Sequence, residues 1–109
     1  MAPIDPNSRR AAVVTASSMI SGDVSLIEGC VRLSALSHDL VQTWHEDPDF
    51  QVFGVVASDT DHLPTGSARK YWSPDALVRE DPKIAAYEAK ARADILAACQ
   101  SIVSRFSDA

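Results

Sequence analysis

Four prolines in this chain directly follow a residue whose side chain can cap a helix: Asp5-Pro6, Asp47-Pro48, Ser73-Pro74 and Asp81-Pro82. An aspartate or serine oxygen accepts hydrogen bonds from the free N–H groups of a first helical turn. Proline at the first helical position loses no hydrogen bond, because the N–H that it lacks would have had no partner there. Each pair therefore predicts a helix start, and the chain is constrained to fold from helices.

A fifth helix start lies in the segment "ISGDVS", residues 20–25. Gly22 can end the first helix in a left-handed conformation, and Asp23 or Ser25 can begin the next helix. Ser25 and Glu28 also have the spacing of a capping box. The first helix is thus predicted over about residues 6–21.

The segments between these starts carry apolar residues at helical spacing. In the second segment the stripe is Leu26, Cys30, Leu33, Leu36 and Leu40. In the last segment it is Ile84, Tyr87, Ala91, Ile95, Ala98, Ile102 and Phe106. Leu96, Cys99 and Val103 widen this last stripe, so that little of its second half can face water. We therefore expect a long C-terminal helix at the centre of the fold.

The segment "FQVFGVVA", residues 50–57, fits a helix or a strand. Valine and phenylalanine favour strands, whereas a helix from Pro48 places Phe50, Phe53 and Ala57 on one face. A single strand without a partner would leave its backbone groups unpaired, so the helix is favoured. The prediction is an all-α, single-domain bundle of four to five helices over residues 1–109, with loose ends at 1–5 and 107–109.

Composition excludes several classes of function. The net charge of −5 argues against nucleic acid or an anionic membrane as the main partner. The longest apolar run is far shorter than the roughly 18 residues of a membrane span, and the first residues do not have the pattern of a secretory signal. Cys30 and Cys99 are expected to be buried thiols in a reducing cytosol, which predicts a cytoplasmic protein.

Charge is segregated along the chain. No lysine or arginine lies between Arg32 and Arg69, and that gap holds all three histidines: His38, His45 and His62. It also holds six acidic residues: Asp39, Glu46, Asp47, Asp49, Asp59 and Asp61. These residues concentrate around the two ends of the predicted third helix.

Three interpretations of the acidic segment compete. In the structural one, Asp47 caps a helix, Asp49 lies in its first turn, and Asp59 and Asp61 form a turn after it. In the second, Asp59, Asp61 and His62 form a metal site or an acid–base site. No zinc or calcium motif with the required spacing occurs, and no catalytic motif supports this alternative, so we expect neither a metal nor another cofactor.

The third interpretation is a surface that binds a cationic protein. Unlike charge steers the encounter of two proteins, and aromatic residues supply much of the affinity at interfaces. The residues of this predicted surface are Trp44, Glu46, Asp47, Asp49, Asp59, Asp61, His62 and Trp72. Both tryptophans also fit a core position. A further alternative is a structural subunit that forms a homodimer through an exposed apolar helix face.

The stretch "DPDFQVFGVVASDTDHLP" resembles a family of short, uncharacterised bacterial helical proteins. These share a DxDF…F block followed by a Ser-Asp/Glu-Thr-Asp-x-Leu-Pro segment, and the resemblance spans about residues 10–106. In size and acidity the chain also resembles the immunity proteins of bacteria. That resemblance implies a non-enzymatic protein that binds and neutralises a cationic toxin domain, often a nuclease.

Overall fold

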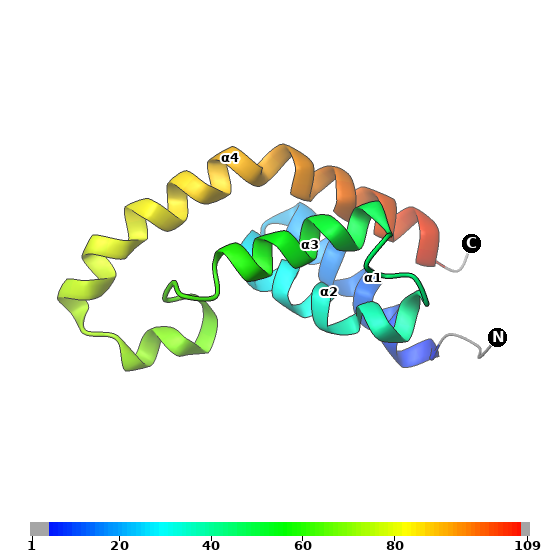
Figure 1. Cartoon of the computed structure of the whole chain (residues 1–109), viewed down its shortest axis with the longest axis horizontal. Helices are drawn as coiled ribbons and strands as arrows, with labels where there is room; N and C mark the ends of the chain where they lie inside the picture. Colours follow the sequence, from blue (N-terminus) through cyan, green and yellow to red (C-terminus); the bar gives the residue numbers. More distant parts are fainter. Residues whose placement is uncertain (1–4, 108–109) are drawn as a thin grey trace.

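The computed structural model describes residues 5–107, which form four α-helices and one 3-10 helix (Figure 1). α1 spans Pro6–Ser21, α2 Leu26–Leu40, α3 Pro48–Asp59 and α4 Pro74–Phe106; the 3-10 helix η1 spans Gly66–Tyr71. No strand occurs among the described residues. The prediction of an all-α bundle with a long C-terminal helix is confirmed, as is the helix over residues 50–57. The predicted loose ends fall mainly on residues 1–4 and 108–109, which lie outside the described residues.

Four of the five predicted helix starts are confirmed by their hydrogen bonds. The N–H of Asn7 donates to Asp5 at 2.9 Å, and that of Ala76 donates to the Ser73 hydroxyl at 3.1 Å. Ser25 caps α2 in the same way, and Asp47 caps α3. Gly22 ends α1 with a φ of 88°, a left-handed conformation that favours glycine.

The remaining predicted start, Asp81-Pro82, is wrong. Pro82 lies inside α4, which is one continuous, curved helix (Figure 1). Proline leaves the carbonyl of Val78 without its usual helical partner, but the Val78 side chain is 73% exposed, so water can reach this side of the helix. Asp81 does not cap; its carboxylate accepts two hydrogen bonds from Arg69, at 2.7 and 3.2 Å. The helix begins at Pro74 with Ser73 as its cap, so residue 81 lies within the helix and not at its start.

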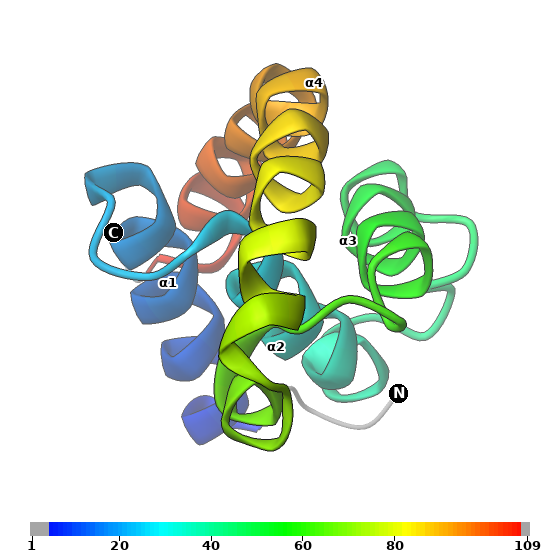
Figure 2. The ribbon, with the colours of Figure 1, turned by 90° about the vertical axis from the view of Figure 1, so that its left-hand side faces the viewer.

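The helices enclose the core in cyclic order. α4 packs against α1 and α3, and α2 packs against the same two helices from the opposite side (Figure 2). The largest side chains that are almost completely buried are Phe53, Met19, Ile27, Leu33, Ile95 and Ile102. The second half of α4 buries one face against this core, whereas Ala97, Gln100 and Ser104 on its outer face are exposed. The widened apolar stripe thus overstated how much of this half is buried.

Cys30 and Cys99 are free and buried in the core, as predicted. Burial raises the pKa of the Cys30 thiol to about 12 and that of the Cys99 thiol to about 11. Both thiols are therefore protonated at neutral pH and unsuited to nucleophilic chemistry.

The first half of α4 extends beyond the other three α-helices. The described chain measures 49 × 24 × 23 Å, and η1 together with the start of α4 forms its narrow end (Figure 1). We call residues 65–82 the arm. Tyr71 and Val78 on the arm are 81% and 73% exposed. Among residues 5–107 there is no helix with the length and apolar character needed to span a membrane.

Candidate functional site

The structure divides the predicted acidic surface into two groups, one at each end of α3. Asp47 and Asp49 lie at the start of the helix, and Asp59 and Asp61 lie at or just after its end. A helix of 12 residues is about 18 Å long. The carboxylates that are close in sequence therefore do not form one continuous patch.

The first group forms ion pairs with Arg105 near the end of α4. Its guanidinium donates to Asp47 at 2.7 and 3.0 Å and to Asp49 at 2.8 Å. The guanidinium also lies over the ring of Phe106, at 5.1 Å from the centroid. Ser101 donates a further hydrogen bond to Asp49 at 2.6 Å. We call Arg105, Asp47 and Asp49 the arginine clamp; it joins the start of α3 to the end of α4, and its one guanidinium offsets part of the charge of the two carboxylates.

The clamp shifts the titration of Asp47. Burial by itself raises the pKa of this carboxyl, but the hydrogen bonds and charge of Arg105, with two backbone N–H groups, hold the pKa below its usual value of about 4. Since the pKa is lower in the folded state, ionised Asp47 contributes stability above about pH 4, and this contribution is lost as the pH falls through the folded-state pKa.

The lowered pKa of Asp47 gives a testable prediction for acid stability. Urea unfolding of the wild type should show a loss of unfolding free energy below about pH 4. Asp47→Asn keeps the capping oxygen but cannot titrate, so its unfolding free energy should fall less over the same pH range. Equal losses for the two proteins would show that the clamp does not control acid stability.

The second group has a different environment. Tyr87 on α4 donates a hydrogen bond of 2.9 Å to Oδ2 of Asp59. Burial, and then the hydrogen bond to Asp59, raise the pKa of Tyr87 to about 12, so the phenol stays a donor at neutral pH. The side chains of Asp61 and His62 are 78% and 72% exposed and lie 3.7 Å apart. Within residues 5–107, no lysine or arginine forms an ion pair with Asp59 or Asp61.

The other predicted surface residues are spread over the molecule. Trp44 is half-buried against the core, with the rings of His38 and His45 at 4.7 and 5.4 Å. Glu46 is exposed in the connection before α3. Trp72 is half-buried on the arm, more than 20 residues along the chain from Trp44. Each tryptophan thus exposes only part of its side chain.

The metal alternative receives no supporting geometry from the described part of the chain. There, no group of three or more histidine, cysteine, aspartate or glutamate side chains is arranged to hold a metal ion. Asp61 and His62 point into solvent rather than lining the cavity described next.

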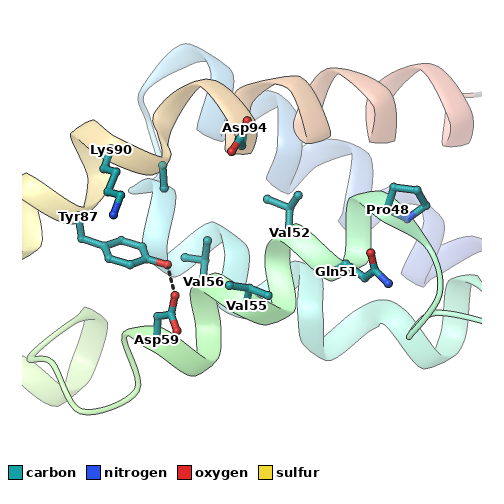
Figure 3. Close-up of a pocket in the computed structure, with 10 residues that line it drawn as sticks. Pro48, Gln51, Val52, Val55, Val56, Asp59, Tyr87, Lys90 and Asp94 are labelled. Carbon is teal, nitrogen blue, oxygen red and sulfur yellow. Dashed lines mark hydrogen bonds between the residues drawn. The ribbon is translucent and has the colours of Figure 1, made fainter.

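Sequence reasoning missed a groove between α3 and α4 (Figure 3). Its volume is about 460 Å³. The α3 wall consists of Pro48, Gln51, Val52, Val55, Val56 and Asp59. The α4 wall consists of Tyr87, Lys90, Ala91 and Asp94.

A sequence signal for this groove did exist. The predicted core face of α3 was Phe50, Phe53 and Ala57, yet "VFGVVA" carries valines outside this stripe. Val55 is 57% exposed on the groove side. A second apolar face on a short helix indicates either a second packing partner or an open binding surface.

Comparisons with known proteins place the chain in one family. Residues 10–102 match a family described as protein of unknown function (DUF2489). Neither the curated proteins nor the solved structures contain a match to this chain.

Proposed function

The chain belongs to the DUF2489 family, whose description supplies no activity, and from the geometry we propose that it is a non-enzymatic domain that binds a cationic protein. The finer form of the proposal is an immunity protein that acts in the cytoplasm and neutralises a basic toxin domain of the nuclease type. The observation that carries it is the uncompensated negative charge at the C-terminal end of α3.

Helix electrostatics separate the two acidic groups. Carboxylates are stabilised at the start of a helix, where the dipole is positive, and Asp47 and Asp49 occupy that end and pair with Arg105. Asp59 and Asp61 lie at the negative end, where carboxylates are unfavourable, and α3 has no basic residue in its last turn. Contacts within the fold therefore account for the first group and, through Tyr87, for one oxygen of Asp59, whereas the carboxylate of Asp61 is 78% exposed. A cationic partner would be attracted to these carboxylates and would offset their unfavourable interaction with the helix dipole.

The charge of the whole chain supports the same partner class. The net charge is −5, and residues 33–68 contain no lysine or arginine. Such a surface raises the association rate of a cationic protein and repels nucleic acid. Salt should weaken the interaction, because exposed charges are screened over about 8 Å at physiological ionic strength.

Charge reversal at Asp61 tests the proposal. Asp61 is the clean position, because Asp59 is also bonded to Tyr87. Asp61→Lys should slow association with the partner about three- to tenfold at low salt and leave the melting temperature nearly unchanged. The partner is obtained by affinity capture from the host at low salt and elution with rising salt, and the rate is then measured with the purified pair.

The matched control is Asp23→Lys, which reverses an exposed aspartate in the turn between α1 and α2. This variant should associate at the wild-type rate. A large fall in the melting temperature of Asp61→Lys with unaltered binding would instead show that Asp61 is a turn former. Capture of no salt-released basic protein would leave the proposal without support.

A further inference from the structure

The groove between α3 and α4 is an open, largely apolar surface next to the acidic end of α3. Val52, Val55 and Val56 line it from α3, and Ala91 lines it from α4 (Figure 3). Val55 keeps 57% of its surface exposed and Val52 is half-buried, whereas Val56 is 3% exposed and forms the floor of the groove as part of the core. An apolar wall left in water gains free energy when a partner covers it.

The charges along the groove indicate the charge of the segment that it would bind. The α3 wall contains no cation, and the carboxylates of Asp59 and Asp94 lie on opposite walls. Tyr87 occupies Oδ2 of Asp59, which leaves Oδ1 able to accept a further hydrogen bond. Lys90 is the one cation among the lining residues. The groove therefore favours an apolar segment that carries lysine or arginine over an acidic one.

The shape of the groove indicates a helix. The α3 wall is about 18 Å long, which matches about three turns of a second helix. Residues 5–107 contain no sheet edge, so no extended peptide can add to the fold as a strand.

We infer that the groove binds an amphipathic helix of the cationic partner, with its apolar face on Val52 and Val55 and its basic residues near Asp59 and Asp94. This inference rests on the proposed function and adds the binding site and the secondary structure of the bound segment. The acidic end of α3 then speeds the encounter, and the valines supply the affinity that persists after docking.

Three peptides of about 14 residues, long enough to span the groove, test the inference. The first has leucine and lysine at helical spacing, the second has the same composition interrupted by prolines, and the third has glutamate in place of lysine. NMR titration of the full chain, with labelled valine methyl groups, gives both the dissociation constant and the location. The leucine–lysine helix should bind with shifts at Val52, Val55 and Val56, and the other two peptides should bind at least tenfold more weakly.

Two valine variants test whether the groove side chains contribute to the affinity for the peptide. Val55→Asn removes an apolar side chain from the groove and should weaken the leucine–lysine peptide about tenfold. Val14→Asn is the matched control, because Val14 on α1 is also 57% exposed and does not line the groove. It should bind the peptide as the wild type does.

The outcomes separate this inference from the proposed function. Equal binding by Val55→Asn and Val14→Asn, equal binding of the proline-containing peptide, or no binding of the leucine–lysine peptide would each overturn the groove as a helix site. If Asp61→Lys weakens the peptide and Val55→Asn does not, the cationic partner stands and only the groove fails. Preferential binding of the glutamate peptide would contradict both.

Discussion

Replacing Arg105 by methionine is expected to lower the free energy of unfolding by about 2–3 kcal/mol. Methionine retains most of the aliphatic packing but leaves Asp47 and Asp49, whose side chains are only 12% and 18% exposed, without their cation. Removing one partner of a fully buried ion pair costs about 3–5 kcal/mol, and an exposed pair contributes about 0–1 kcal/mol. Arg105 is 33% exposed, so the expected cost lies between these limits.

Urea unfolding at neutral pH measures this effect, and two further variants interpret it. Arg105→Lys keeps the charge but loses the paired N–H groups that reach both carboxylates, so an intermediate cost is expected. Arg79→Met removes an exposed arginine from the same helix and should change the unfolding free energy by less than about 0.5 kcal/mol. A similarly small change for Arg105→Met would show that the clamp behaves as a surface ion pair and contributes little to the free energy of unfolding.

Adding one methyl group at Gly29 is expected to destabilise the fold by about 2 kcal/mol. A Cβ atom at this position would lie 2.1 Å from Sδ and 2.4 Å from Cγ of Met19. Met19 is 2% exposed, and its sulfur already contacts the Cys99 thiol at 3.6 Å, so it has little room to move. Three Met19 atoms closer than 3.0 Å place the overpacking at the upper end of its range, about 3 kcal/mol, and the gain of about 1 kcal/mol that alanine brings to a helix leaves a net cost of about 2 kcal/mol.

The chain supplies its own control for Gly29→Ala. Gly54 also lies within a helix, but a Cβ there meets only Oγ of Ser34 at 4.0 Å. Gly54→Ala should therefore stabilise the protein by about 0.5–1 kcal/mol. In the background of Met19→Ala, which removes the colliding atoms, Gly29→Ala should no longer destabilise. Thermal and urea unfolding of the single and double variants measure the coupling, and an equal cost in both backgrounds would refute the steric explanation.

Local chemistry made the helix starts predictable. Asp5, Ser25, Asp47 and Ser73 each act on an N–H group two or three residues away, so the information lies within one turn of sequence. The same argument failed at Asp81 because a cap-like residue before proline is also tolerated inside a helix that another residue has started. The preference of Asp81 for Arg69, which is 12 residues away, depends on the fold of the arm.

The candidate site was only partly predictable, because its geometry joins distant segments. The sequence indicated carboxylates at both ends of α3, but the arginine that pairs with the carboxylates at one end lies 58 residues from Asp47. Tyr87 reaches Asp59 across 28 residues. The groove is lined by residues of both α3 and α4, so a residue pattern within α3 alone cannot predict it.

The position of the arginine clamp also affects how the chain folds during synthesis. Arg105 must reach Asp47, and Arg9 near the start of α1 donates to the carbonyl of Phe106 at 2.7 Å. α4 supplies Ile95, Ile102 and Phe106 to the same core as α1. Helices α1 to α3 therefore emerge from the ribosome with one wall of their core missing. Native closure has to wait until residue 106 has left the exit tunnel, and until then the nascent chain exposes the apolar surface that α4 later covers.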